Sequence, residues 1–290
     1  MAHMTATLHS GPSLNSAQSA RTRALWLPRE HGAWGMLLMP LATGAAVGVG
    51  RAANYVALLV FTIAALSLFW LRTPVEALVG TSVIRVRDAK ERRVALTTIA
   101  IILAIAFVAL TALFRGFRNF GLLAIGSAAA LAFGLQSVLK KRGRSYRAIS
   151  QVIGSIGLTS TAASAYYVVT GRFDSIALTL WVVNWLFAGE QIEFVQMRIR
   201  GARLENVHDR LSHGTSYLAT VSAIGITIIL LSLTGILPSL TIFAFVPAEV
   251  RSLIWFTSKS SSLDVHQLGS LELANAFVFA FVLIVIFRVG

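Results

Sequence analysis

The chain has no cysteine and few charged residues. Without a thiol, disulfide bonds, thiolate nucleophiles, iron–sulfur clusters and cysteine-ligated zinc are excluded, so histidines and carboxylates are the remaining metal ligands. Only 13% of its 290 residues are charged, whereas 56% are hydrophobic. That proportion leaves too little polar side chain to cover a soluble globule of this length. We therefore expect lipid to solvate most of the outer surface.

Acidic residues are scarcer than basic ones. The chain has 12 Asp and Glu against 25 Lys and Arg, which gives a formal net charge of +13. Such a charge can indicate nucleic-acid binding, but here the basic residues form short clusters at the ends of apolar runs. That arrangement is typical of membrane topology signals. We therefore expect no nucleic-acid partner.

The sequence consists mostly of long apolar runs. A helix needs about 20 apolar residues to cross about 30 Å of hydrocarbon. The sequence therefore predicts an all-α, polytopic membrane protein with about nine transmembrane helices, over residues 33–49, 53–71, 94–114, 120–139, 149–169, 175–195, 216–234, 237–256 and 271–287. In the eighth, prolines and charged residues favour a broken or shallow helix as the alternative, namely Pro238, Pro247, Glu249 and Arg251.

The basic residues are divided unequally between the two sides of these spans. Twenty fall on the side of the N-terminus and five on the other. The positive-inside rule then predicts a cytoplasmic N-terminus and, with nine crossings, an outside C-terminus. Residues 1–24, rich in Ser, Thr and Ala, are predicted to be a disordered cytoplasmic tail. Residues 25–290 are predicted to form a single transmembrane helical domain.

The sixth predicted span carries the most polar side chains. Glu190, Gln191, Glu193 and Gln196 stand there in apolar sequence. An ionisable group inside a span costs several kcal/mol unless it is paired or wet, so each is a candidate for function. Positions 190 and 193 share a helical face, and two like charges there require a cation, an arginine or a shared proton. A divalent metal and pairing with nearby arginines are both open.

Two further groups lie at the ends of spans. Glu30 and His31 precede the first span. They are either an interfacial anchor near a helix N-terminus or ligand and proton-handling groups in a cytoplasmic cavity. Arg72 and Glu76, at the end of the second span, have i, i+4 spacing. Arg72 suits a phosphate, and the alternative is a charge that snorkels to the interface.

The segment 27–40, Leu-Pro-Arg-Glu-His-Gly-Ala-Trp-Gly-Met-Leu-Leu-Met-Pro, carries a family resemblance. It resembles the opening of the YwiC-like family of bacterial membrane proteins. The resemblance implies a multi-pass protein of the bacterial cytoplasmic (inner) membrane, in contact with membrane lipids. It implies no particular activity.

The whole plan also resembles the UbiA-type intramembrane prenyltransferases. The first predicted span has Arg29, Gly32, Gly35 and Pro40, as in that superfamily's first helix. Further along, Lys141-Arg142 with Gln151 and Gly154 is similar to its Lys-Arg and Gln-x-x-Gly motifs. Trp185 with Glu190 is similar to a Trp and an acidic residue of its sixth helix. It implies a UbiA-like helical bundle with a cytoplasmic-facing cavity for an isoprenoid. If the chain is catalytic, it also implies a prenyl diphosphate bound through Mg²⁺.

The UbiA resemblance assigns roles to individual residues. The metal ligands are Glu76, Glu190 and Glu193. The substrate is bound by Arg72, Lys141, Arg142 and Gln151. The catalytic groups are Glu30, His31, Glu190 and Glu193. The pattern departs from the family at its first aspartate motif, where Arg72, Thr73, Glu76 and Gly80 stand and one carboxylate of three remains.

Three functions follow, of unequal support. The leading hypothesis is a membrane protein of UbiA-like fold that binds an isoprenoid or lipid-like ligand at a cytoplasmic-facing cavity, with divergent prenyl transfer left open. The alternative is a non-catalytic membrane subunit or assembly factor that holds a lipid, a quinone-like ligand or a membrane protein partner, and the missing metal ligands favour it. A transporter is less favoured, because the sequence shows no convincing internal repeat.

Overall fold

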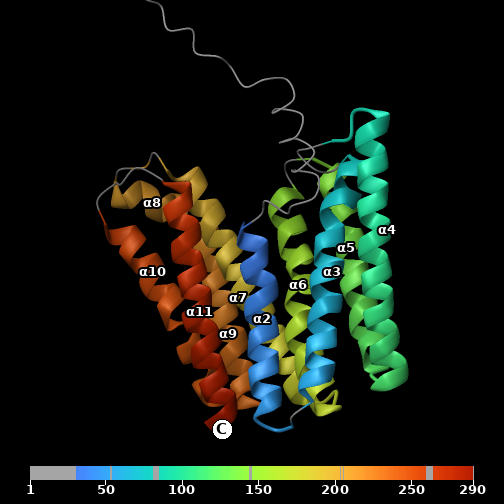
Figure 1. The fold of residues 1–290 in the computed structure, drawn as a ribbon. Coiled ribbons are helices and arrows are strands. Elements are labelled where there is room, and N and C mark those ends of the chain that lie inside the picture. The colour runs from blue at the N-terminus through green and yellow to red at the C-terminus, as the bar shows by residue number, and fades with distance from the viewer. Residues whose placement is uncertain are drawn as a thin grey trace, which may run out of the picture. The chain divides into compact units, whose positions relative to one another are not determined.

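The computed structural model describes residues 31–52, 54–80, 85–143, 146–202, 204, 206–258 and 264–289. Every regular element in this part of the chain is a helix, which confirms the predicted all-α class. In chain order (Figure 1) they are α2 (His31–Val49), α3 (Tyr55–Val79), α4 (Ala89–Thr111), the π-helical turn η1 (Ala112–Gly116), α5 (Gly121–Lys141), α6 (Arg147–Thr170), α7 (Ser175–Arg200), α8 (Val207–His213), α9 (Thr215–Leu233), the 3₁₀ helix η3 (Ser239–Ala244), α10 (Val246–Thr257) and α11 (Val265–Val289). The predicted tail, residues 1–24, lies outside the described residues.

Most of these helices are long and apolar enough to cross a bilayer. Among the described residues there are 8 such segments: Gly32–Val49, Tyr55–Val79, Ala89–Gly116, Gly121–Lys141, Ala148–Thr170, Thr215–Leu233, Ser239–Thr257 and Val265–Val289. The polytopic membrane class is thereby confirmed. The remaining predicted span forms α7, whose 26 residues are long enough. It is not among the 8 segments, and polar side chains occupy its second half.

The chain divides into two compact units, each described by itself. Of the described residues, the first unit holds the end of α3 from Leu66 and α4 as far as Phe107, and the second holds the others. In the first unit, Asp88 caps α4, because its Oδ1 accepts from the Glu91 backbone N at 2.7 Å. Glu91 Oε2 in turn accepts from the Arg87 N at 2.8 Å. This reciprocal capping fixes where α4 begins. The predicted single domain over residues 25–290 stays a prediction.

In the second unit, α2 and α6 pack closely against each other. A Cβ on Gly44 would lie 1.9 Å from the Ala162 carbonyl oxygen, so only glycine fits there. Thr161 Oγ1 donates to the Leu37 carbonyl oxygen at 3.0 Å. Small residues and hydroxyl bonds of this kind hold helices together in lipid, where burial of apolar surface gives little gain. A Cβ on Gly48 would lie 3.1 Å from the Val169 Cβ, so the contacts advance along both helices from Leu37 and Thr161 to Gly48 and Val169, and α2 and α6 run in the same direction.

The second unit has two ends, which we call the His31 end and the Val49 end after the first and last residues of α2. At the Val49 end, Arg51 Nη2 donates to the Phe287 carbonyl oxygen at 3.1 Å, and Arg288 Nη2 donates to the Ala46 oxygen at 2.7 Å. The last turns of α2 and α11 therefore lie side by side. The two helices run in the same direction, as expected of the first and last of nine crossings.

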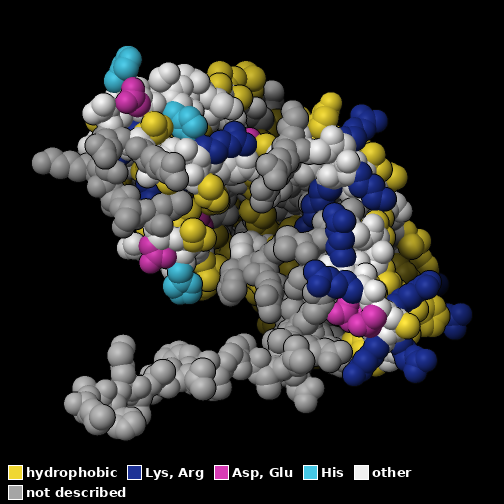
Figure 2. Space-filling model, turned by 90° about the horizontal axis from the view of Figure 1, so that it is seen from above, with side chains coloured by type: hydrophobic (Ala, Val, Ile, Leu, Met, Phe, Trp, Pro, Cys, Tyr) yellow, Lys and Arg dark blue, Asp and Glu magenta, His cyan; other side chains and the backbone are white. Residues whose placement is uncertain are grey.

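Basic side chains of the second unit are concentrated at the His31 end. Helices α5 and α7 both finish there, with Lys140, Lys141, Arg198 and Arg200 in their last turns. Lys and Arg side chains are visible on this face in Figure 2. Which side of a membrane the His31 end faces stays a prediction, with the cytoplasm expected from the positive-inside rule.

The eighth predicted span is a candidate membrane span, but it is interrupted. The 3₁₀ helix η3 precedes α10, and Phe245 separates them. Pro247 stands in the first turn of α10, where its missing N–H leaves no bond unmade. Glu249 and Arg251 follow within α10. The broken-helix alternative thus describes this segment, and the break places Arg251 on a helix of 12 residues.

An aromatic layer lies between this charged helix and the Val49 end. The rings of Phe187 in α7 and Phe279 in α11 stack with centroids 3.8 Å apart, and Phe245 packs edge-on against Phe279 at 5.3 Å. Phe187 and Phe279 are 5% and 1% exposed. The charged residues of α10 therefore have these packed rings on the side of the Val49 end.

Candidate functional site

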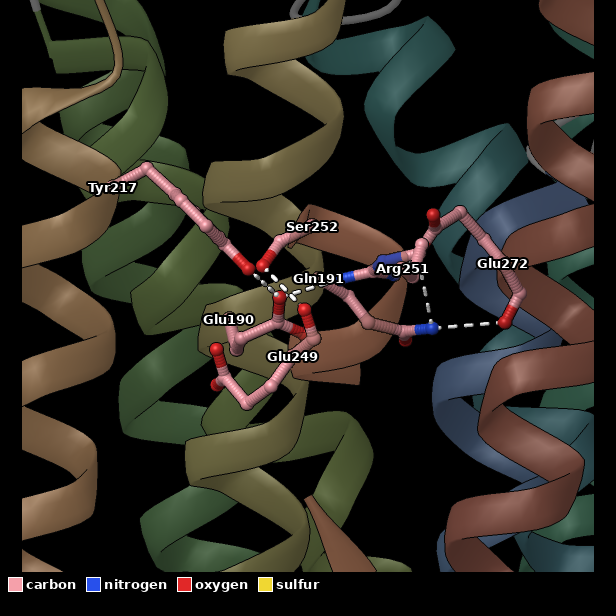
Figure 3. A network of polar contacts seen from close by, with 7 residues as sticks. All are labelled: Glu190, Gln191, Tyr217, Glu249, Arg251, Ser252 and Glu272. Atoms are coloured by element: carbon pink, nitrogen blue, oxygen red, sulfur yellow. Dashed lines mark hydrogen bonds and ion pairs between the residues drawn. The ribbon is translucent and has the colours of Figure 1, made fainter. Parts of the chain in front are cut away.

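Three charged side chains from separate helices meet inside the second unit. Arg251 of α10 donates through Nη2 to Glu190 Oε1 of α7 and through Nη1 to Glu272 Oε2 of α11 (Figure 3). We call Glu190, Arg251 and Glu272 the acid–arginine cluster. The planar guanidinium, with its fork of donors, suits two carboxylates at once. One basic residue therefore joins three helices.

The acid–arginine cluster lies within the helices rather than at their ends. Glu190 is ten residues before Arg200, the last residue of α7, a rise of about 15 Å. Glu272 is seven residues into α11, a rise of about 10 Å. The Glu190 side chain is 1% exposed. Charges at such depth are costly in lipid, and pairing with each other reduces that cost.

Neighbouring polar groups add further bonds. Tyr217 of α9 donates its hydroxyl proton to Glu190 Oε1 at 2.6 Å. Gln191 Nε2 donates to the Glu272 carbonyl oxygen at 2.9 Å and to Glu272 Oε2 at 3.4 Å. The Arg251 guanidinium carbon lies 3.8 Å from the centroid of the Phe194 ring, within cation–π range. Four helices, α7, α9, α10 and α11, thus fix the positions of these charges.

Each member of the acid–arginine cluster also has one buried atom without a hydrogen bond. Glu190 Oε2, Arg251 Nε and Glu272 Oε1 have no partner among the described residues. A buried polar atom left unpaired costs about 1–3 kcal/mol. Native proteins contain few such atoms, and each requires an explanation. Three of them in one ion-pair network indicate a site that is not arranged for stability alone.

A second group of charges lies between this network and the His31 end. The guanidinium carbons of Arg198 and Arg210 lie 5.6 and 5.5 Å from the centroid of the Trp255 ring. Arg210 donates to the carbonyl oxygens of Trp255 and Ser258 at the end of α10, and to that of Leu204 shortly after α7. Because helix C-termini leave carbonyl groups unpaired, this arginine acts as a cap.

Of the predicted site residues on α7, Glu190 is central and Glu193 is not. Glu193 is partly buried, and it makes no ion pair within the described ranges. Gln151 accepts a bond from Gln196 Nε2, and Gln196 Oε1 accepts from Arg200 Nη2 at 2.6 Å. Gln151 therefore lies in a separate polar chain near the His31 end, and its substrate role stays a prediction.

The other predicted residues lie at the end of α5, in the first unit, or outside the described residues. Lys141 and Arg142 are exposed at the end of α5. In the first unit, Arg72 Nε donates to Glu76 Oε1 at 2.9 Å, so the predicted i, i+4 pair forms. Glu30 lies outside the described residues, and His31 is described only by its backbone, which begins α2.

Arg251, Glu272 and Tyr217 are the site residues that sequence reasoning missed. In the sequence, Arg251 is only one of the residues that interrupt the eighth predicted span, and Glu272 stands at the start of the ninth. Both are ionisable residues within apolar runs, the same signal that identified Glu190. Their mutual pairing depends on how α7, α10 and α11 pack, which helical periodicity does not reveal.

The Mg²⁺ implied by the UbiA resemblance can be tested against the side chains present. Within the part of the chain that the structure describes, no group of three His, Asp or Glu residues is placed to hold a metal ion. Glu190 Oε1 already accepts from Arg251 and Tyr217, and Glu76 is paired with Arg72. Mg²⁺ requires about six oxygens in octahedral geometry. The described side chains therefore do not fit such an ion, and we derive no step through it.

Comparison with known proteins bears on the N-terminal part of the chain. Residues 27–166 match the family model described as YwiC-like protein. No curated protein and no solved structure matches the chain. The match confirms the resemblance seen in residues 27–40, and it stops before α7, α10 and α11. The UbiA resemblance is not confirmed. This multi-pass helical membrane protein is thus similar to the YwiC-like family over residues 27–166.

Proposed function

We propose that this multi-pass membrane protein binds a lipid-like molecule of the isoprenoid or quinone class, with the polar head of the ligand at the acid–arginine cluster. The three unpaired buried atoms, Glu190 Oε2, Arg251 Nε and Glu272 Oε1, are the observation that supports this most directly. A ligand head that bonds to them removes the cost of leaving them unpaired. The surrounding helices are apolar, which suits a hydrocarbon tail.

The charge of the acid–arginine cluster limits the chemistry of the head. Arg251 is paired with two carboxylates, so the cluster itself carries an excess of negative charge. A diphosphate would be repelled there. The atoms without a hydrogen bond are two carboxylate oxygens, which accept, and one N–H group, which donates. They suit a neutral head group that has hydroxyl donors and a carbonyl or hydroxyl acceptor. The proposal is therefore a non-catalytic binding protein rather than a prenyltransferase.

Access to these atoms requires movement, because they are closed to solvent in this structure. Helix α10 is the element suited to move. It is 12 residues long and follows the break at Phe245, and Arg251 is its charged link to α7 and α11. A shift of α10 would separate Arg251 from one carboxylate and open the cluster to a head group.

Native mass spectrometry of the protein released from nanodiscs tests the proposal. The nanodiscs carry membrane lipids and one added isoprenoid alcohol or ubiquinone-type quinol. We expect wild type to retain the added molecule and Glu190→Gln to lose most of it, because the Arg251 pair and an accepting oxygen are removed together. Glu193→Gln, the same change one turn along α7, is the matched control and should bind as wild type does.

Two results would overturn the proposal. One is equal retention by wild type and Glu190→Gln. The other is magnesium-dependent release of diphosphate from a prenyl diphosphate incubated with the wild-type protein, which would replace binding with transfer chemistry.

A further inference from the structure

Glu249 is the ionisable residue near the acid–arginine cluster that has no cation of its own. It lies two residues before Arg251 on α10 and interacts electrostatically with Glu190 and Arg251. Figure 3 shows it next to Glu190. The described residues offer it no ion pair, and it is only partly exposed. It stands eight residues before the end of α10, a rise of about 12 Å, and within the candidate membrane span Ser239–Thr257.

A count of the charges that face each other here leaves one carboxylate in excess. The acids are Glu190 on α7, Glu249 on α10 and Glu272 on α11. The facing arginines are Arg251, paired with two of these acids, and Arg198, which interacts electrostatically with Glu272. Three negative charges against two positive charges leave a net charge of −1. In a low-dielectric region that residual charge is costly, and a bound proton removes it.

The other polar groups packed around these residues do not supply the missing positive charge. Tyr217 on α9 is neutral and donates to Glu190. Arg210 on α8 donates to three backbone carbonyl oxygens. The Ser252 hydroxyl donates to the Glu249 backbone oxygen at 2.8 Å and leaves the Glu249 carboxylate without that donor.

One buried acceptor near Glu249 lacks a hydrogen-bond donor within the described ranges, and a protonated carboxyl group is such a donor. Glu190 Oε2 is an acceptor with no donor among the described residues. A protonated Glu249 has an O–H group, and it stands beside Glu190. Such an O–H is a donor of the kind that Glu190 Oε2 lacks. An ionised Glu249 cannot donate, and it would repel Glu190.

We propose that Glu249 is an intramembrane proton-binding site, which holds a proton while the ion pairs of Arg251 with Glu190 and Glu272 stay formed. Loss of that proton places a third negative charge next to Glu190 and weakens the attachment of α10. This site shares Glu190 Oε2 with the lipid-binding proposal, but it requires no organic ligand, so the two proposals are tested by separate measurements. It makes α10 the element whose position responds to pH.

Infrared difference spectroscopy of the protein in nanodiscs tests this directly, because a protonated carboxylic acid has a carbonyl band that a carboxylate lacks. We expect wild type to show this band at neutral pH and to lose it as the pH rises. Glu249→Gln, which is nearly isosteric, should lack the band. Glu193→Gln should retain it. Absence of a titrating band in wild type, or its persistence in Glu249→Gln, would overturn the assignment.

Thermal unfolding supplies a second readout that does not depend on spectral assignment. The Tm of wild type should fall as the pH rises above neutral, because deprotonation adds repulsion at Glu190. Glu249→Gln should show a clearly smaller fall over the same range. An equal fall in the two proteins would contradict the role of Glu249, whatever the outcome of the lipid-retention experiment.

Discussion

Arg251 is the shared partner of two buried carboxylates, and its side chain is 14% exposed. A buried ion pair adds little net stability compared with apolar side chains of the same size, because desolvation offsets the attraction. Removal of one partner has a much larger effect, since it leaves a buried charge uncompensated. We therefore expect the stability of the protein to fall when one member of the acid–arginine cluster is replaced, and to change much less when all three are replaced together.

Arg251→Met should accordingly lower the free energy of unfolding by about 3–5 kcal/mol. The methionine fills much of the space of the arginine stem but leaves Glu190 and Glu272 unpaired. The triple variant Glu190→Gln, Arg251→Met, Glu272→Gln removes the three charges of the acid–arginine cluster and should recover most of that loss. Denaturant titration in detergent micelles measures both variants. A single variant as stable as wild type would show that the ion pairs do not form.

For single residues, the sequence predicts one member of the acid–arginine cluster but not its partners. An acid inside an apolar run identified Glu190 as a candidate, and the structure places it at the centre of the polar network. The same reasoning grouped Glu190 with Glu193 by helical spacing, whereas the structure pairs it with Arg251, which is 61 residues away in the chain. Spacing along one helix shows which side chains share a face. It does not show which other helix lies opposite.

At the scale of elements, each of the nine predicted spans corresponds to a helical segment. Length and apolar content were sufficient for this, because an unpaired backbone group in lipid forces helix formation. The break before α10 was expected from Pro247 and the nearby charges. The sequence does not predict the close packing of α2 and α6, because nothing in it distinguishes Gly44 from the other glycines among the 22 in the chain. The structure shows that the Ala162 carbonyl oxygen lies against Gly44.

Gly44→Ala tests that packing. The added Cβ would lie 1.9 Å from the Ala162 oxygen, so the helices must separate or the protein loses stability. Gly225→Ala in α9 is the matched control, since a Cβ there meets nothing within 4 Å. In a helix, Ala is favoured over Gly by about 1 kcal/mol, so the control should be neutral or slightly stabilising. Equal Tm values for the two variants would contradict the close approach of α2 and α6.

At the scale of the whole molecule, the distribution of basic residues predicts which side of the membrane each loop faces. Twenty basic residues against five is a strong asymmetry, and such asymmetry sets orientation during insertion. In the second unit, Lys141 and Arg142 lie at the His31 end, and Arg51 and Arg288 lie at the Val49 end. The expected orientation therefore places the His31 end in the cytoplasm.

The absence of cysteine makes this orientation simple to measure. Arg142→Cys and Arg172→Cys each introduce a single thiol, at the end of α5 and in the turn between α6 and α7. In intact bacterial cells, a membrane-impermeant maleimide should label Arg172→Cys, and it should label Arg142→Cys only after lysis. Labelling of Arg142→Cys in intact cells would reverse the predicted topology.

The central claim is that the acid–arginine cluster binds the head of a lipid-like molecule. The most direct measurement is retention of an isoprenoid alcohol or quinol by the uncharged triple variant Glu190→Gln, Arg251→Met, Glu272→Gln, once its folding is established by denaturant titration. Native mass spectrometry should find the molecule on wild type and on Glu193→Gln, and find it largely absent from the folded triple variant. Retention by the triple variant at the wild-type level would contradict the account.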